Sequence, residues 1–332
     1  MSVLAPSVAV VWKLIEAEGL DPAPLFAEEG LSFELPIEPG TRVDYLPVDR
    51  VRARVAEMVG DPAFGLKVAR HVHPSHLGAL GYAWLASSSM RTAFMRLQRY
   101  VRVLNDQGRV KLETSGGQFQ MTVAVAQDSL NARVRDDAQA AVLMTLCRMN
   151  LGERFKPDYI SIPHPEPDDR GPYERFFRCP LRFNAKKVGI GFPATVADAT
   201  LPSANPMLAQ MNERIANRRL AALDVEHTPN RVRAEIMEQL PNGNLSDESV
   251  AEALHMTSRT LHRRLKEHDT SFRDVLGEVR RELAEQYIAD PTLTLTEITF
   301  LLGFAEASSF SRAFRRWTGQ SPSAAREAQP QD

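Results

Sequence analysis

The chain has 332 residues, which is long enough for two domains of ordinary size, each with its own core. Hydrophobic residues make up 43% of the sequence and charged residues 25%, which excludes collagen-like, low-complexity and largely disordered architectures. The formal net charge of −2 gives no overall indication of a nucleic-acid or membrane partner.

The sequence lacks the features that mark secreted or membrane proteins. Two cysteines, Cys147 and Cys179, are too few for a disulfide framework and favour a reducing compartment. No uncharged apolar stretch approaches 18 residues, so no membrane span is expected. The first residues contain no basic segment, and Lys13 and Glu16 interrupt the apolar run that follows, so we expect no signal peptide. A cytoplasmic location is therefore predicted.

The N-terminal part of the chain mixes helix and strand patterns. Helices are predicted at 8–18, 48–59, 90–104 and 134–155. Strands are predicted at Arg109–Thr114, Gln118–Ala126, Tyr159–Ile162, Leu181–Phe183 and Val188–Phe192. Gly116-Gly117 between the first two strands indicates a hairpin, and the strict alternation of apolar residues in the second indicates a sheet with one buried face. This part is predicted to be an α+β domain.

The pattern changes after the proline-rich part of the chain. A helix is predicted at Met207–Leu223, and the segment 224–229 is interpreted as a linker. From residue 230 to residue 326 the helical pattern is almost uninterrupted. The predicted organisation is therefore an α+β domain at 1–223, a linker at 224–229 and an all-α domain at 230–326.

The all-α domain contains an internal repeat, because residues 245–271 and 293–322 have the same pattern of helix, tight turn and helix. The turns are predicted at His255-Met256 and Gly303-Phe304, and Ser246 and Thr294 are suited to cap the two first helices. A long linker helix, 272–289, joins the two units and ends before Asp290-Pro291. Leu261, Leu265, Phe310 and Phe314 are the expected inward anchors of the second helices.

Helix pairs of this spacing are typical of the helix-turn-helix motif, whose second helix enters the DNA major groove. The second helices present side chains that bind phosphates or base edges. In the first unit these are Arg259, Thr260, His262, Arg263 and Lys266, and in the second they are Ser308, Ser309, Ser311, Arg312, Arg315 and Arg316. We therefore predict double-stranded DNA as a partner.

The charge balance of this domain leaves a second interpretation open. Residues 228–332 contain 13 Lys and Arg against 16 Asp and Glu, a formal charge of −3, whereas DNA-binding domains are usually basic. The basic residues are concentrated in 258–268 and 307–318, and the second of these segments has no acid. The alternative hypothesis is an effector-binding protein whose helical domain is a protein-interaction module without DNA specificity.

The C-terminal part resembles the AraC/XylS family of bacterial transcription regulators over about 100 residues. The matching segments are Met256–Phe272, with the sequence MTSRTLHRRLKEHDTSF, and Leu301–Pro322, which ends in Gly-Gln-Ser-Pro. The resemblance implies that Arg259, His262 and Arg263 read bases, with Thr260 and Lys266 near the DNA backbone. Ala307, Ser308, Ser311 and Arg312 occupy the corresponding face of the second unit, and Ala307 departs from the pattern because it has no hydrogen-bonding group.

The N-terminal part resembles the arabinose-binding-type regulatory domain of one branch of that family. The segments that carry this resemblance are Asp61–Gly65, Leu77–Ala86 and Tyr173–Phe183. The resemblance implies a ligand-sensing, dimerising domain for a small-molecule effector of unspecified identity. It also implies a transcription regulator, with activation through RNA polymerase as the expected mode and a homodimer as the expected assembly.

Several apolar and aromatic side chains are candidates for lining an effector pocket, since such sites are mostly apolar. They are Tyr82, Trp84, Phe94, Phe119, Met121 and Leu146. Ordinary core packing is the alternative interpretation of the same residues. Cys147 lies in an apolar helix pattern and is interpreted as an inert buried thiol.

Catalytic and metal-binding signatures were sought as well. The sequence has no Gly-x-Gly-x-x-Gly, phosphate-binding loop, His-Glu-x-x-His or Gly-x-Ser-x-Gly motif, so we expect neither an enzyme nor a cofactor. The segment His71–His76 has three histidines, but no cysteine or carboxylate cluster adjoins it, and we expect no metal there. Asp136-Asp137 is interpreted as the solvated start of a helix.

Overall fold

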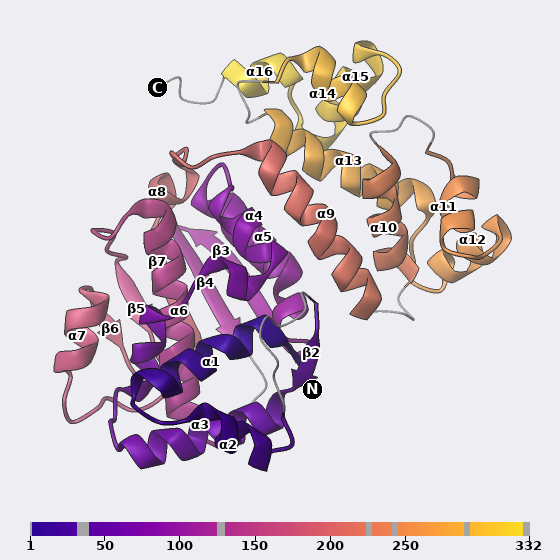
Figure 1. Ribbon diagram of the computed structural model, residues 1–332. Coiled ribbons are helices and arrows are strands. Elements are labelled where there is room, and N and C mark those ends of the chain that lie inside the picture. Colours follow the sequence, from indigo (N-terminus) through magenta and orange to yellow (C-terminus); the bar gives the residue numbers. More distant parts are fainter. Residues whose placement is uncertain are drawn as a thin grey trace. The chain divides into compact units, whose positions relative to one another are not determined.

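The computed structural model describes residues 2–31, 40–124, 130–223, 228–240, 245–288 and 293–327. The chain forms two compact units, Met1–Asn212 and Glu213–Asp332 (Figure 1). Among the described residues, no helix combines the length and the apolar character needed to cross a membrane.

The N-terminal unit is built on a five-stranded sheet with the strand order β3-β4-β7-β5-β6 (Figure 1). The strands are β3 (Arg109–Ser115), β4 (Gln118–Ala124), β5 (Tyr159–Ser161), β6 (Leu181–Arg182) and β7 (Val188–Pro193). Only β5 and β6 pair in parallel. Gly116 and Gly117 both have positive φ, as a two-residue hairpin turn requires, so the predicted hairpin is confirmed. The last predicted strand residues, 125 and 126, lie outside the described residues.

Helices pack around this sheet, and a short pairing of β1 (Ser2–Leu4) with β2 (Arg42–Asp44) lies beside them. The α-helices are α1 (Ala5–Ala17), α2 (Pro22–Glu28), α3 (Tyr45–Val59), α4 (Ala79–Leu85), α5 (Met90–Leu104), α6 (Ala132–Leu151), α7 (Gly171–Phe177) and α8 (Ala194–Asp198). Two 3₁₀ helices, η1 (Phe64–Arg70) and η2 (Pro74–Leu77), precede α4. The helix predicted at 134–155 begins two residues earlier, at Ala132, and ends four residues earlier, at Leu151, because Gly152 adopts φ +85° and ends α6.

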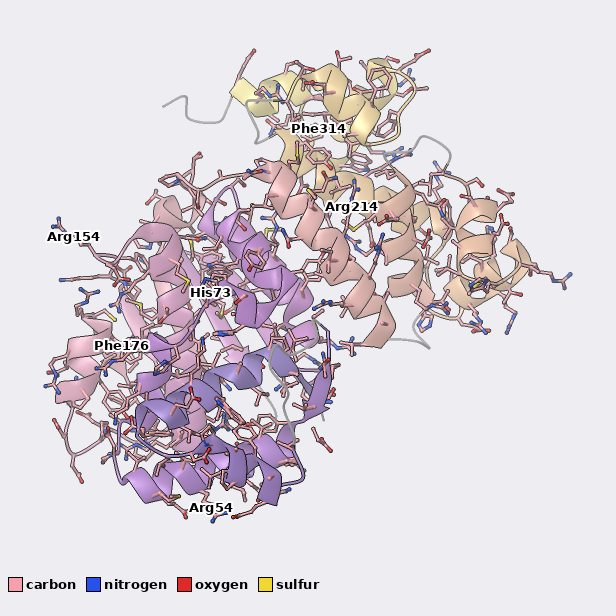
Figure 2. The ribbon with its side chains drawn as sticks, in the orientation of Figure 1. Arg54, His73, Arg154, Phe176, Arg214 and Phe314 are labelled. Atoms are coloured by element: carbon pink, nitrogen blue, oxygen red, sulfur yellow. The ribbon has the colours of Figure 1, made fainter. Side chains whose placement is uncertain are left out.

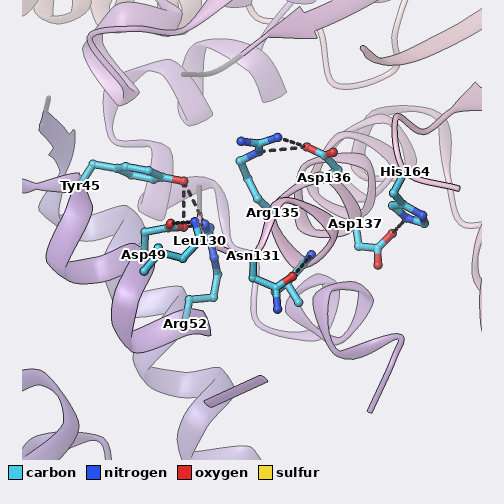
Figure 3. A network of polar contacts seen from close by, with 10 residues as sticks. Tyr45, Asp49, Arg52, Leu130, Asn131, Arg135, Asp136, Asp137 and His164 are labelled. Carbon is cyan, nitrogen blue, oxygen red and sulfur yellow. Dashed lines mark hydrogen bonds and ion pairs between the residues drawn. The ribbon is translucent and has the colours of Figure 1, made fainter. Parts of the chain in front are cut away.

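The interpretation of Asp136-Asp137 as solvated was wrong, since their exposed fractions are 4% and 0%. The Asp137 carboxylate accepts a hydrogen bond from Tyr173 Oη at 2.7 Å. It also lies 2.8 Å from His164 Nε2 (Figure 3). Asp136 accepts from Arg135. The burial of both carboxylates is compensated by these partners, as a buried charge requires.

Two glycines in the N-terminal unit allow close approaches between elements. A Cβ on Gly81 in α4 would lie 1.9 Å from the backbone oxygen of Pro74 in η2. A Cβ on Gly65 in η1 would lie 2.6 Å from the Val134 oxygen in α6. The close packing of η1 against α6 and of η2 against α4 therefore depends on glycine, which has no side chain, at these two positions.

The division between the units falls inside α9 (Pro206–Leu223), before the segment 224–229 that was predicted as the linker. The reason is that the second half of α9 packs against α10 (Thr228–Gln239), where Asn217 Nδ2 lies 2.7 Å from Met237 Sδ. Residues 224–227 lie outside the described residues, and Thr228 and Pro229 already belong to α10.

The C-terminal unit is entirely helical over its described residues. After α10 come α11 (Asp247–Ala253), α12 (Ser258–Lys266), α13 (Phe272–Ile288), α14 (Leu295–Leu301), α15 (Ala307–Thr318) and α16 (Pro322–Glu327). A single apolar core includes Leu261, Leu265, Phe310 and Phe314, which confirms the four predicted anchors. Phe314 points into this unit, whereas Arg154 projects from the surface of the other (Figure 2). The end of α13 falls near the predicted stop, but Asp290 and Pro291 lie outside the described residues.

Candidate nucleic-acid interface

The two helix pairs, α11–α12 and α14–α15, have equivalent turns. His255 in the first turn has φ +55° and Gly303 in the second has φ +65°, so one left-handed residue reverses the chain in each. Ser246 and Thr294 cap the first helices through capping boxes, as predicted. Thr294 donates its backbone N–H to Glu297 Oε2 at 2.7 Å, and this hydrogen bond, together with the one from its hydroxyl, lowers the pKa of Glu297.

Core packing sets which face of α12 is exposed. Leu261 and Leu265 are fully buried, so residues on the opposite side of the helix project outward. Of the predicted site residues, Arg259, His262, Arg263 and Lys266 are exposed and Thr260 is half-buried. The structure therefore brings these five side chains together on or beside one solvent-facing surface.

Core packing also sets which face of α15 is exposed. Phe310 and Phe314 are buried and Ala313 packs beside them, which leaves the opposite side of the helix free. The predicted residues Ser308, Ser311, Arg312 and Arg315 are all exposed. Ala307, the first residue of α15, is also exposed and offers no hydrogen-bonding side chain there.

Intramolecular partners hold two of the predicted reading residues in α12. His262 Nε2 lies 2.6 Å from Asp247 Oδ2 in α11, and this hydrogen bond lowers the pKa of Asp247. Arg263 Nη1 donates to Glu267 Oε1 at 2.7 Å. Both partners were missed as parts of the site, although the spacing of Arg263 and Glu267 by one helical turn was a usable signal.

Contacts within α15 are weaker. Arg312 Nη2 donates to Ser309 Oγ at 3.3 Å, and Ser308 Oγ donates to Glu306 Oε2 at 3.1 Å. Glu306 precedes the basic segment of the second unit, yet its carboxylate lies at the start of α15. Four cations, Arg259, Lys266, Arg315 and Arg316, have no polar side-chain partner among the described residues. They remain available to an anionic ligand.

Arg280 in α13 ties the linker helix to the second pair. Its Nε donates to the Leu302 carbonyl at 2.9 Å and its Nη2 to the Gly303 carbonyl at 2.8 Å. Its guanidinium carbon lies 4.4 Å from the centre of the Phe304 ring. Burial lowers the pKa of Arg280, but a guanidinium stays charged at neutral pH. These contacts satisfy the two carbonyls that follow α14 and orient the turn that leads to α15.

The N-terminal unit contains a cavity of about 300 Å³. It is lined by parts of α1, α3, η1, η2, α5, β4 and α6. Two of the six residues predicted to line an effector pocket, Met121 and Leu146, lie in its wall. The size and the largely apolar lining are typical of small-molecule sites.

The structure places the other four predicted pocket residues elsewhere. Trp84, Phe94 and Phe119 pack in an aromatic cluster, with ring centres 4.9 Å apart for the first pair and 5.4 Å apart for the second. Trp84 Nε1 also donates to the Leu146 carbonyl at 3.0 Å. Tyr82 is 42% exposed on α4. Core packing is therefore the better description of the aromatic three, and Tyr82 lies on the surface.

Histidines and cysteines provide no further site among the described residues. No cluster of three metal-ligating side chains occurs there, and His76 instead accepts a hydrogen bond from the His73 backbone N–H at 3.1 Å. Cys147 is fully buried, and burial raises its pKa, which agrees with its interpretation as an inert thiol. Burial also raises the pKa of Cys179 to about 11.

Comparison with protein families agrees with both halves of the chain. Residues 19–201 match the model of the arabinose-binding domain of AraC transcription regulators, and residues 250–328 match a helix-turn-helix domain. Together these matches cover most of the N-terminal unit and nearly all of the two helix pairs.

Individual relatives extend over nearly the whole chain. The ornithine utilization regulator of Pseudomonas aeruginosa is 31% identical, with 95% of this chain and 93% of the relative covered. The transcriptional regulator VqsM of the same organism is 28% identical over 77% of this chain and 81% of its own length. The crystal structure of the regulator CdpR from that organism has the same fold, with a TM-score of 0.54 at 23% identity, covering 96% of this chain and 98% of CdpR.

Proposed function

The chain belongs to the AraC family of DNA-binding transcription regulators, and we propose that α12 and α15 read two successive segments of the major groove. The residues proposed to contact DNA are Arg259, Thr260, His262, Arg263 and Lys266 from α12, and Ser308, Ser311, Arg312 and Arg315 from α15. The observation that carries this proposal is the exposure of both basic helix faces at the ends of two equivalent turns, joined by one linker helix.

Base readout is assigned mainly to arginine in this proposal. A guanidinium can bind guanine O6 and N7 in bidentate fashion, which suits Arg263 in α12 and Arg312 in α15. His262 is held by Asp247, so its contribution is expected to be smaller than that of Arg263. Ala307 leaves the start of α15 without a polar contact, which places more of the second readout on Arg312.

Control by a small molecule is the second part of the proposal. The cavity in the N-terminal unit is the candidate effector site, and a bound effector would shift the population of DNA-competent chains. We also propose activation through RNA polymerase, assembly as a homodimer and action in the cytoplasm, and membership of the family supports these three points. A protein-interaction module without DNA specificity is not favoured, since both helix pairs keep the reading geometry.

Two experiments test the proposal that α12 and α15 read DNA. The first selects bound duplexes from a random DNA library, and the second measures the affinity for the selected duplex as a function of salt concentration. Each phosphate neutralised by Lys or Arg contributes about 0.9 to the slope of log affinity against log salt. Arg263→Ala is expected to weaken specific binding by about 1–3 kcal/mol. The matched control is Arg54→Ala, which removes an exposed arginine of α3 and should leave affinity unchanged. A flat salt dependence, or equal effects of both variants, would contradict DNA reading by α12.

A further inference from the structure

The polar groups of the cavity in the N-terminal unit indicate which chemical class of molecule it accepts. Seven of the 25 described residues that line it are polar, and the rest are aliphatic, methionine, alanine or glycine. Its volume of about 300 Å³ corresponds to on the order of ten water molecules at about 30 Å³ each. A ligand with about ten non-hydrogen atoms and an apolar body therefore fits this space.

Among the described lining residues, the charges that face the cavity are all of one sign. Its titratable lining residues are Tyr45, Arg52, His76 and Arg135, and no carboxylate is among the described lining residues. Burial lowers the pKa of His76, and the charges of Lys13 and His73 lower it further, so its imidazole is neutral at pH 7. The two guanidinium groups are thus the formal charges in the wall.

Two carboxylates hold these guanidinium groups from positions outside the lining (Figure 3). Asp49 pairs with Arg52 and also accepts the Leu130 backbone N–H at 2.8 Å, while Asp136 accepts from Arg135 Nε and Nη2 at 2.9 and 2.8 Å. This arrangement offsets the long-range field of each arginine. What remains for a ligand is a set of short-range donors with fixed orientation.

Arg52 has unused donor capacity. Its Nη2 donates to Asp49 and, at 2.9 Å, to Tyr45 Oη. Its Nε is buried and has no hydrogen-bond partner among the described residues. A buried donor without a partner destabilises the fold, and an acceptor placed beside it would remove that cost.

We propose that this cavity binds a small organic carboxylate with an apolar body, and that the carboxylate accepts hydrogen bonds from the Arg52 guanidinium. The aliphatic wall receives the body of the ligand. The hydrogen bond from the charged guanidinium to a carboxylate is charge-assisted, and it is stronger than the hydrogen bond to a neutral amide. A primary ammonium group would lose its hydration beside two guanidinium groups without gaining a carboxylate. This inference rests on the proposed function only in taking the bound carboxylate as the effector.

Calorimetric titration of the full chain tests the proposal with two probe series. One consists of octanoate, octanamide and octylamine, and the other of 3-phenylpropanoate with its amide and its amine. At least one carboxylate is expected to bind at least tenfold more tightly than its amide, with no measurable binding of the amines. Failure of both carboxylates to bind, or an amide or amine binding as tightly as the carboxylate, would overturn the proposal.

Variants separate the charge from the shape of the site. Arg52→Gln is expected to weaken carboxylate binding at least tenfold while leaving the amide within about twofold, and Arg52→Lys, which keeps the charge, should recover part of the loss. Val142→Phe fills the cavity without changing its charge and should weaken acid and amide alike. Thermal unfolding without ligand checks that each variant is folded. Unchanged carboxylate affinity in both Arg52→Gln and Val142→Phe would place binding elsewhere and refute the assignment.

DNA binding is measured on the same preparations, so the two proposals fail separately. If the carboxylates do not bind but Arg263→Ala still weakens specific DNA binding, the ligand class is wrong and the DNA-reading proposal stands. If a carboxylate binds through Arg52 but no variant of α12 or α15 changes DNA binding, the DNA-reading proposal is wrong and the ligand class stands.

Discussion

Arg263 illustrates how a side chain that we propose to read DNA is held in the free protein. Its guanidinium and the Glu267 carboxylate are 65% and 54% exposed, so their ion pair contributes only about 0.3–0.5 kcal/mol. A bidentate contact to guanine discriminates by about 1–3 kcal/mol, which is larger. We therefore expect Arg263 to exchange Glu267 for a base edge at a small cost in free energy.

Glu267→Gln removes the competing carboxylate and one negative charge close to the DNA phosphates. Affinity for the selected duplex is expected to rise severalfold, most strongly at low salt, where charges are least screened. Fluorescence anisotropy with a labelled duplex measures it. Glu327→Gln in α16 makes the same charge change as a control, and an equal gain there would mean that only net charge matters.

His164 is the residue with the clearest expected pH effect on stability. Burial by itself lowers its pKa, but the hydrogen bond and the charge of Asp137 outweigh burial, and the net pKa of His164 is raised. Its charged form therefore stabilises the fold fully below the unfolded pKa of about 6.5, and this contribution is lost as pH rises through the folded pKa.

The corresponding experiment compares thermal midpoints of the parent chain and His164→Gln between pH 5.5 and 9. The stability advantage of the parent over the variant should shrink as pH rises. His71→Gln, in the same unit, is the control and should follow the parent. An advantage that is constant or grows with pH would contradict the assigned ion pair with Asp137.

At the scale of elements, α13 does more than connect the two helix pairs. Through Arg280 it holds the turn Leu302–Gly303 and the Phe304 ring, so the direction of α15 depends on one half-buried side chain of the linker helix. Gly303 itself has little freedom to change, because a Cβ there would lie 3.3 Å from Leu240 and its φ is positive.

Arg280→Ala is expected to weaken the second helix pair by about 1–3 kcal/mol through the loss of two hydrogen bonds from a charged donor. Hydrogen exchange should accelerate in α14 and α15 but not in α11 and α12, and specific DNA affinity should fall. The neighbouring Arg281→Ala is a matched control, since that side chain is 51% exposed and lies 3.8 Å from Glu285. Equal effects of the two variants would contradict the positioning role of Arg280.

The helix pairs could be predicted from the sequence because their determinants are local. Caps at Ser246 and Thr294, apolar spacing and the turn residue Gly303 all lie within a few residues of the feature they specify. The hydrogen-bond partners of Asp137 could not be predicted from the sequence, since His164 and Tyr173 are 27 and 36 positions away. Asp247, the hydrogen-bond partner of His262, was also missed, because it lies on another helix.

The cavity in the N-terminal unit shows the same limit of prediction more strongly. Phe119 and Met121 occupy the same face of β4 and are both buried, yet only Met121 lines the cavity. Periodicity assigns both to the interior, whereas the choice between packed core and cavity wall depends on α1, η1 and α6. Arg52, the ligand contact proposed above, was not predicted, since it is one of three alternating arginines, Arg50, Arg52 and Arg54, and no sequence signal distinguishes it from the other two.

For the whole molecule, the formal charge of −3 on residues 228–332 is compatible with DNA binding because the charges are segregated. Exposed cations gather on α12 and α15, and Arg259, Lys266, Arg315 and Arg316 have no polar side-chain partner among the described residues. Such an interface makes a limited number of phosphate contacts. Its salt dependence should therefore be real but modest.

The most direct test of paired reading is footprinting of the full chain on DNA flanking its own gene, with Arg263→Ala and Arg312→Ala as variants. Two protected patches about one helical turn apart are predicted, with Arg263→Ala weakening one patch and Arg312→Ala the other. A single patch, or two patches that both variants weaken equally at every position, would contradict separate readout by α12 and α15.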